Sequence, residues 1–173
     1  MSGYNIPIYY RKGLIRMLTG VPGILSPDML KVLCEMGHGD SLVIADGNFP
    51  AESVGKNAIV LRADGHGVPE LLDAILTMIP LDQYVEKPVH LMEVVPGDPV
   101  KTPIWDTYKE IIGHHDERDS DVIGTYERFA FYEEAKKAYL IIATSEMAQY
   151  ANVMIQKGCV LAEGVSKPKD MAK

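Results

Sequence analysis

An uninterrupted apolar run at residues 139–144 (YLIIAT) constrains the fold of this 173-residue chain more than any other segment. Its side chains do not alternate between apolar and polar, so the run predicts a central strand that is covered on both faces. A helix that can supply such cover is well marked, because Ser26 is a typical N-cap, Pro27 a typical first helical residue and Gly37 a typical helix end. The run therefore favours a sheet that lies between helices.

Strand and helix signals alternate along the rest of the chain. The sequence predicts strands at 41–44, 58–62, 89–94 and 152–155, helices at 69–79, 104–112 and 127–138, and a charged loop at 113–120. Short strands separated by helices predict a single layered α/β/α domain with a mixed β-sheet. We expect this domain to span 17–164, between an N-terminal extension (1–16) and a polar C-terminal tail (165–173).

The composition argues against several classes of partner. The formal net charge of −7 disfavours nucleic acid and anionic membranes. No apolar run is long enough to span a bilayer, and the first residues lack the pattern of a signal peptide. Cys34 and Cys159 are too few and too far apart for a disulfide framework or a zinc ligand pair. We therefore expect a cytoplasmic protein.

A histidine and an aspartate flank the strand predicted at 41–44. His38 lies between two glycines, and Asp46 begins a turn eight residues later. An imidazole that exchanges a proton near neutral pH, together with a carboxylate, suits proton shuttling on a hydroxylated substrate. A helix end, a strand and a turn that carry polar residues explain the same pattern equally well.

The C-terminal half offers a second group of polar candidates. Arg128 opens a predicted helix, and Tyr150 and Asn152 share one face of a strand start. Phenol and carboxamide groups both donate and accept hydrogen bonds, which suits sugar hydroxyls. The alternative for Arg128 is a surface ion pair, with Phe129 and Tyr132 in the core. The alternative for Tyr150 and Asn152 is a simple turn before an edge strand.

Other site types have weak support in the sequence. The chain carries no complete dinucleotide fingerprint, no phosphate loop and no Gly-x-Ser-x-Gly elbow. The segment 114–116 (HHD) suggests a metal site, but a solvated charged loop is the better interpretation. Asp64 and His66 indicate a turn in which the aspartate binds backbone amides. Trp105, the single tryptophan, is either a flat apolar surface for a sugar ring or part of the core or an interface.

Several sequence blocks occur together and in a fixed order. The blocks are 23–27 (GILSP), 36–40 (MGHGD), 44–46 (IAD), 48–51 (NFPA), 62–65 (RADG), 127–133 (ERFAFYE), 135–138 (AKKA), 150–152 (YAN) and 157–158 (KG). With them, the stretch from about residue 18 to residue 161 resembles the fucose mutarotase and ribose pyranase family. The block around Arg128 looks like the fucose branch, because the ribose branch typically has a histidine there. A longer start and the polar tail depart from the family pattern, and neither touches a motif.

The resemblance implies roles for individual residues. His38 matches the catalytic histidine of the family, and Asp46 matches a sugar-binding carboxylate. Arg128 matches a basic position that contacts the substrate, and Tyr150 with Asn152 matches the sugar-binding Tyr-x-Asn. The resemblance also implies a protein that needs no cofactor or metal. It implies ring-like homo-oligomers, such as a decamer, with the sugar site close to subunit contacts.

The expected activity is that of a mutarotase acting on L-fucose, and as a further expectation on the pyran and furan forms of D-ribose. The ring opens to an aldehyde, the C1–C2 bond rotates, and the ring closes on the other face. One imidazole can act as acid and base in this cycle. Two alternatives stay open: a non-catalytic monosaccharide-binding or transport accessory protein, and a metal-dependent sugar isomerase that uses His66, His114 and His115.

Overall fold

Six strands form one mixed sheet in the computed structural model, which describes residues 18–162. The strands are β1 (Ser41–Ala45), β2 (Ile59–Ala63), β3 (Val89–Met92), β4 (Ile123–Tyr126), β5 (Leu140–Thr144) and β6 (Val153–Gln156). Their order across the sheet is β2-β5-β1-β6-β3-β4. Strand β5 runs parallel to β1 and β2, and β3 runs parallel to β4, whereas β6 pairs antiparallel with both β1 and β3. The predicted mixed sheet is confirmed.

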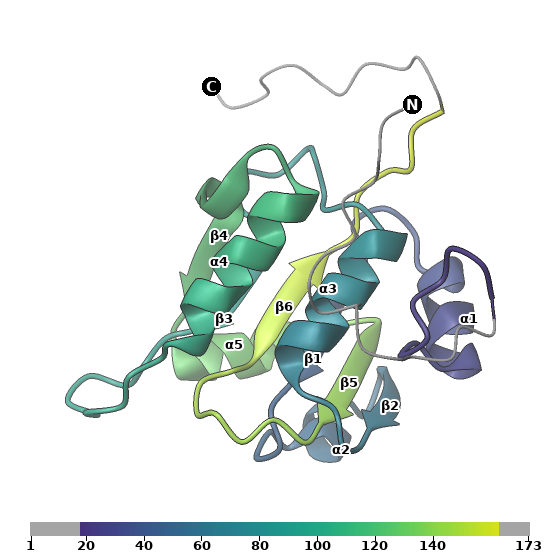
Figure 1. Ribbon diagram of the computed structural model, residues 1–173. Helices are drawn as coiled ribbons and strands as arrows, with labels where there is room; N and C mark the ends of the chain where they lie inside the picture. The colour runs from purple at the N-terminus through teal and green to yellow at the C-terminus, as the bar shows by residue number, and fades with distance from the viewer. Residues whose placement is uncertain (1–17, 163–173) are drawn as a thin grey trace.

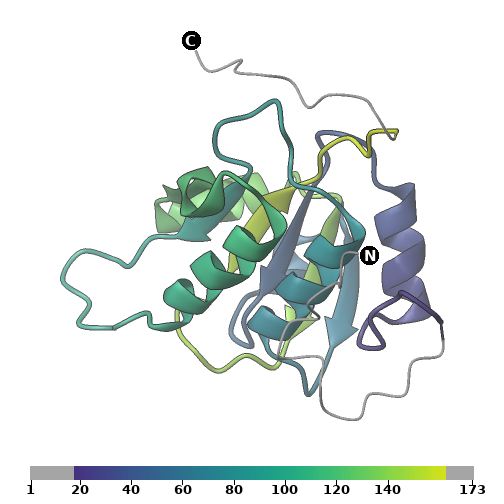
Figure 2. The same cartoon turned by 45° about the horizontal axis from the view of Figure 1, so that its top comes forward.

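Helices cover both faces of this sheet (Figure 1). They are α1 (Pro27–Glu35), α2 (Ala51–Val54), α3 (Val68–Met78), α4 (Ile104–His115), the short 3-10 helix η2 (Asp119–Val122) and α5 (Arg128–Ala135). Helices α1, α3 and α4 share a hydrophobic core with one face of the sheet, and α2 and α5 share a second core with the other face. Figure 2 shows α3 and α4 packed side by side on their face. The layered α/β/α architecture predicted from the sequence is therefore confirmed.

Strand β5 explains why both layers of helices are needed. All five of its residues are buried. Leu140 and Ile142 belong to the core on the α3 side, and Ile141 and Ala143 belong to the core on the α5 side. Successive side chains of a strand point to opposite faces, so an apolar run of this kind requires cover on both.

The region after α4 differs from the sequence-based expectation. Helix α4 continues through His115, and η2 and β4 follow, where the sequence predicts a charged loop at 113–120 and no strand between this loop and the helix at 127–138. The last turn of α4 packs on α3, where His115 Nε2 lies 2.7 Å from Asp73 Oδ1. Strand β4 is a half-exposed edge strand that contains Gly124 and Thr125, so it lacks the apolar pattern of a central strand.

The strand ends place the candidate residues at two opposite edges of the sheet. Asp46 follows the C-terminal end of β1, and Arg128 begins α5 soon after the C-terminal end of β4. Tyr150 and Asn152 precede β6, which is antiparallel to β1, so they lie at the same edge. His38 precedes β1 and therefore lies at the opposite edge.

Two further expectations concern membranes and chain ends. Among residues 18–162, no helix has the length and apolar character needed to cross a membrane. The predicted N-terminal extension (1–16), the tail (165–173) and the domain boundaries at 17 and 164 lie outside the described residues.

Candidate functional site

A cavity of about 350 Å³ opens at the sheet edge where β1 ends and β6 begins. The side chains around it come from strand ends, from the first turns of α5 and from the connecting loops. They are Asp46, Asn48, Phe49, Met92, Asp98, Arg128, Tyr132, Gln149, Tyr150 and Asn152. Of the five residues to which the family resemblance assigns a role, all except His38 line this cavity, which we call the Tyr150 cavity.

Asp46 and Asn152 are joined by two hydrogen bonds between the ends of neighbouring strands. The Asn152 amide donates to Asp46 Oδ2 at 2.8 Å, and the Asp46 backbone N–H donates to Asn152 Oδ1 at 2.9 Å. The backbone N–H of Asn48 donates to Asp46 Oδ1 at 2.9 Å. Burial raises the pKa of the Asp46 carboxyl, and the hydrogen bonds from Asn48 and Asn152 oppose part of this rise. These hydrogen bonds hold the carboxylate at the cavity wall and leave lone pairs that can accept further hydrogen bonds.

Tyr150 adopts an uncommon backbone conformation beside this pair. Its φ of +56° lies in the left-handed region, which L-residues other than Asn and Asp rarely enter. Its phenol donates to Asp98 Oδ2 at 2.7 Å, and the Val95 backbone N–H lies 3.4 Å from the phenol oxygen. The hydrogen bond to Asp98 is the main cause of a raised pKa of Tyr150. Because the phenol proton points to Asp98 and the Val95 N–H occupies one acceptor position, the phenol oxygen keeps a second lone pair that can accept a further hydrogen bond.

Asp98 is a cavity residue that sequence reasoning missed. It lies in the loop between β3 and α4, in no recognisable motif. Met92 also lines the cavity without having been singled out, and so does Tyr132, which the sequence offered only as a core residue. The signal that would have found Tyr132 is its position in helix α5, one turn after Arg128, because side chains four residues apart share a helix face.

Arg128 supplies the positive charge of the Tyr150 cavity. Its guanidinium carbon lies 5.8 Å from the ring centre of Phe129 and 5.9 Å from that of Tyr132. The hydrogen bond with Tyr132 is the largest cause of a raised pKa of Arg128, so the side chain stays cationic. The alternative interpretation of the sequence placed Phe129 and Tyr132 in the core. It is wrong for Phe129, which is 69% exposed, and Phe131 is buried instead.

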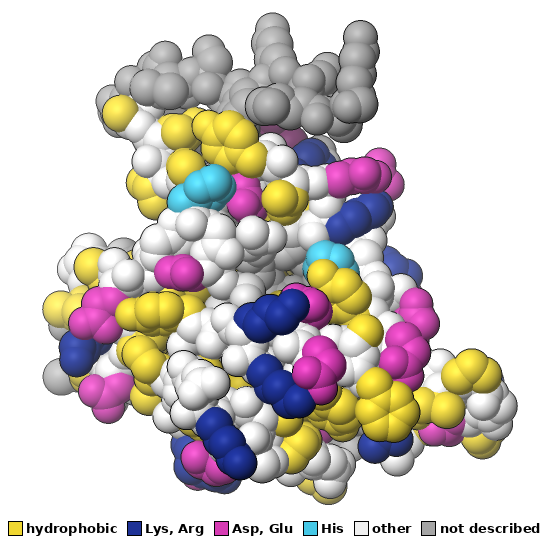
Figure 3. All heavy atoms as spheres, turned by 180° about the vertical axis from the view of Figure 1, so that it is seen from behind, with side chains coloured by type: hydrophobic (Ala, Val, Ile, Leu, Met, Phe, Trp, Pro, Cys, Tyr) yellow, Lys and Arg dark blue, Asp and Glu magenta, His cyan; other side chains and the backbone are white. Residues whose placement is uncertain are grey.

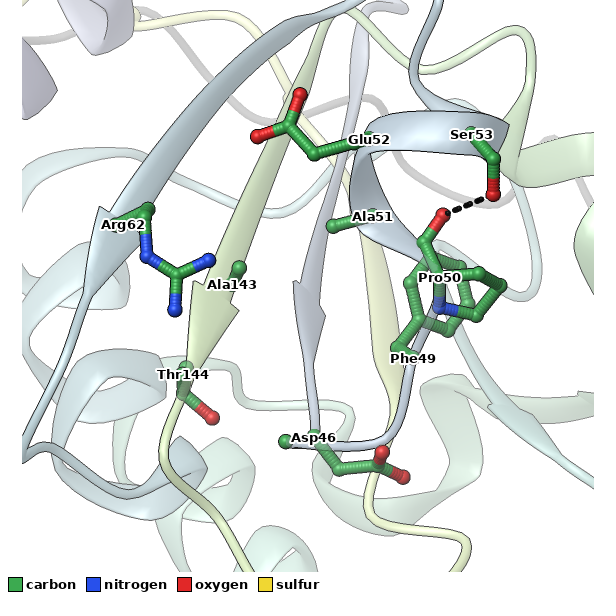
Figure 4. Close-up of a pocket in the computed structure, with 10 residues that line it drawn as sticks. Asp46, Phe49, Pro50, Ala51, Glu52, Ser53, Arg62, Ala143 and Thr144 are labelled. Carbon is green, nitrogen blue, oxygen red and sulfur yellow. Dashed lines mark hydrogen bonds between the residues drawn. The ribbon is translucent and has the colours of Figure 1, made fainter.

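A second cavity of about 290 Å³ shares Asp46 and Phe49 with the Tyr150 cavity. Figure 4 shows Arg62 of β2 reaching toward Ala143 and Thr144 at the end of β5, with Glu52 of α2 on another side. The guanidinium of Arg62 also pairs with Asp64 at 2.7 Å. The expectation that Asp64 binds backbone amides is therefore wrong, because its carboxylate faces the arginine two residues earlier.

His38 lies away from both cavities. Its Nε2 is 3.1 Å from both oxygens of Asp82, whose side chain is 2% exposed, and its ring meets the edge of the Tyr84 ring. The imidazole itself is 45% exposed. Asp82 lies 44 residues further along the chain, between α3 and β3, so no local pattern marks it as a partner. Within one chain, the structure does not bring His38 together with Asp46.

The remaining histidines do not form a metal centre in the described part of the chain. Residues 18–162 contain no group of three or more His, Cys, Asp or Glu side chains arranged to hold a metal ion. His66 pairs with Glu70 on α3 at 3.0 Å. His114 and His115 end helix α4 and do not lie in a solvated loop, and His115 contacts the buried Asp73.

Comparison with known proteins places the chain in a family. The model of the RbsD / FucU transport protein family matches residues 19–160. The chain belongs to this family. FucU from Bifidobacterium longum is 67% identical in sequence, and its crystal structure superposes with a TM-score of 0.82 over 83% of this chain and 100% of that chain.

Two further relatives of this RbsD/FucU family member carry names that describe an activity. The fucose mutarotase of Streptococcus pneumoniae, solved in complex with L-fucose, is 46% identical, with a TM-score of 0.78 over 83% of this chain and 100% of that chain. The fucose mutarotase of Homo sapiens is 47% identical over 147 residues, which are 82% of this chain and 93% of that protein. The family resemblance drawn from the ordered sequence blocks is confirmed.

Proposed function

We propose that this RbsD/FucU family member is a mutarotase that interconverts the α and β anomers of L-fucose. The observation that carries the proposal is the Tyr150 cavity, where a carboxylate, a carboxamide, a phenol and a guanidinium surround about 350 Å³. A few polar groups that converge on a concave space of this size suit one monosaccharide. The relatives that are named fucose mutarotase, one of them solved with L-fucose, support the same substrate.

The reaction requires one proton to leave the anomeric hydroxyl and one to reach the ring oxygen. The electron pair of the O1–H bond forms the C1=O1 double bond, and the pair of the C1–O5 bond takes a proton at O5. The open aldehyde rotates about C1–C2, and the reverse steps close the ring on the other face. Substrate and product are isomers, so the atoms and electrons balance within the sugar.

The side chains divide into sugar-holding groups and one proton-transfer group. We assign sugar hydroxyls to the hydrogen-bonded pair Asp46 and Asn152, to the Tyr150 phenol oxygen and to the Arg128 guanidinium. We assign proton transfer to His38. The Asp82 carboxylate at 3.1 Å orients the imidazole and favours the tautomer with its proton on Nε2, which leaves Nδ1 as the acceptor.

His38 contacts a sugar in this cavity only when it comes from another subunit. The whole of β1 lies between it and Asp46 in its own chain, and the 5 residues of this strand alone span about 16 Å at about 3.3 Å per residue. Proton transfer needs hydrogen-bond distance, or one intervening water. We therefore infer a homo-oligomer in which each Tyr150 cavity receives His38 from a neighbour. The family resemblance implies that this oligomer is ring-like, such as a decamer.

Exposed apolar side chains at the two opposite edges of the sheet, near His38 and near Arg128, support this assembly. Tyr84, beside His38, is 47% exposed, and Phe129, next to Arg128, is 69% exposed. On the face that carries α2 and α5, apolar side chains also stand exposed among charged ones (Figure 3). A contact between two different edges is head-to-tail, and head-to-tail contacts close into rings when the rotation permits.

We also infer a cytoplasmic protein that has neither nucleic acid nor membrane as a partner. The formal net charge of −7 supports the second part of this inference. Cys34 and Cys159 are both free, which suits a reducing compartment. Subcellular fractionation of the source cells tests the location directly.

Magnetisation-exchange NMR on L-fucose tests the activity. We expect exchange between the two anomer signals to be faster with the protein than in buffer alone, and to fall strongly in His38→Ala. Exchange at the buffer rate, together with measurable sugar binding, would instead identify a non-catalytic binding protein. Full activity in His38→Ala would refute the role of His38. A parallel series with D-ribose ranks the two sugars.

A further inference from the structure

Two aromatic side chains of α4 hold the backbone of the segment that carries Tyr150 and Asn152. The Trp105 indole N–H donates to the Tyr150 carbonyl at 2.9 Å. The Tyr108 hydroxyl donates to the carbonyl of the next residue, Ala151, at 2.7 Å. Trp105 and Tyr108 are three residues apart and therefore lie on one face of the helix.

Neither side chain lines the Tyr150 cavity. Tyr108 is fully buried, and Trp105 is partly buried against the core on the α3 side, so the flat surface for a sugar ring considered from the sequence is not observed. A tyrosine hydroxyl in an apolar core requires a hydrogen-bond partner. Tyr108 finds this partner in the backbone that leads directly to Asn152.

The segment bound by α4, residues 150–152, contains a strained backbone conformation at Tyr150. Tyr150 has a φ of +56°, a conformation that is unfavourable for a side chain with a Cβ. Residues keep such conformations only when surrounding contacts impose them. The two carbonyls bound by α4 belong to Tyr150 itself and to Ala151, and Asn152 is then bound to Asp46. The whole tripeptide is thus fixed between α4 and β1.

We propose that Trp105 and Tyr108 are positioning residues for sugar binding. By holding two consecutive carbonyls, they impose the left-handed turn at Tyr150 and direct its phenol and the Asn152 amide into the cavity. This inference rests on the proposed mutarotase function, because it concerns the groups assigned to the sugar hydroxyls.

Tyr108→Phe tests the inference through the separation of KM from kcat. The variant removes one hydroxyl and leaves the aromatic ring in the core. We expect KM for L-fucose to rise about tenfold with a much smaller change in kcat, since displaced binding groups weaken ground state and transition state alike. A merely structural role would lower the folded, active fraction and hence the apparent kcat, while KM stayed constant. Tyr139→Phe is the matched control, because it makes the same chemical change just before β5, at the sheet edge opposite the Tyr150 cavity.

The fluorescence of Trp105 gives a second readout, because the chain has one tryptophan. Its indole N–H is bonded to a residue that holds the sugar, so saturating L-fucose should change the emission of the wild-type protein. We expect Trp105→Phe, which keeps a ring but loses the donor, to raise KM as Tyr108→Phe does. Thermal unfolding of each variant verifies that it is folded at the assay temperature.

The two levels of the proposal fail in different ways. If the wild-type protein neither binds nor turns over L-fucose, the proposed function is wrong. If the wild-type protein is active but KM is unchanged in both folded variants, or its tryptophan emission does not respond to the sugar, the positioning role is wrong.

Discussion

Mixing two inactive variants should restore activity if each sugar site is built from two subunits. One variant, His38→Ala, retains the Tyr150 cavity but lacks the proton-transfer group. The other, Asn152→Ala, retains His38 but loses the amide that holds Asp46. In one chain the two positions lie at opposite ends of β1, separated by about 16 Å of strand. Neither variant can therefore repair its own site.

The expected magnitude follows from counting the sites. A general acid–base group contributes about 10²–10⁴-fold in rate, so His38→Ala alone should lose about that factor. In a ring assembled from equal amounts of both variants, a site is intact when the Asn152→Ala subunit supplies His38 and its neighbour, a His38→Ala subunit, supplies the Tyr150 cavity. This happens in about a quarter of the random head-to-tail contacts. The mixed assembly should therefore recover about a quarter of the wild-type exchange rate per site.

Co-expression of the two variants with different affinity tags, followed by two-step purification, supplies the mixed assembly. Magnetisation-exchange NMR on L-fucose then measures its rate. The control is a mixture of His38→Ala with the double variant His38→Ala, Asn152→Ala, in which no intact site can form. A mixed assembly that stays as inactive as its components, or a fully active monomer of the wild-type protein, would refute the shared site.

Three other variants test the cavity and the core. Asp98→Ala removes the acceptor of the Tyr150 phenol proton, and we expect KM for L-fucose to rise about threefold to tenfold; an unchanged KM would show that the phenol needs no anchor. Burial raises the pKa of Asp46 above its ordinary value of 3.8, so the folded protein binds this proton more tightly than the unfolded chain. The associated stability is present at low pH and is lost as pH rises through the raised, folded pKa, so the unfolding free energy of the wild type relative to Asp46→Asn should fall in urea titrations as the pH rises above the ordinary value of 3.8. A flat difference would contradict this assignment. Ile142→Ala, in the centre of β5, should lower the unfolding free energy by about 2–5 kcal/mol, and Ile59→Ala, which is 36% exposed on the edge strand β2, by clearly less. Equal losses would mean that the core does not depend on β5.

Local chemistry explains which parts of the fold were predictable. The N-cap at Ser26 was visible because the signal lies within one turn, and its hydroxyl does accept the Met29 N–H at 3.2 Å. The two-sided strand β5 was visible because burial on both faces leaves no room for polar alternation. Strand β4 was missed because an edge strand is half exposed and tolerates Gly124 and Thr125. Asp82 and Asp98 were missed because each derives its role from a partner far away in the sequence.

The sequence by itself determined the layered α/β class and the chemical groups that a sugar site requires. Only the tertiary structure decided which of those groups meet. Asp46 and Asn152 are 106 residues apart and share two hydrogen bonds, because β1 and β6 are neighbours in the sheet. His38 and Asp46 are eight residues apart and do not meet, because an extended strand carries the chain about 3.3 Å further with every residue. Strand pairing brings distant residues within hydrogen-bond reach, and strand extension separates near ones.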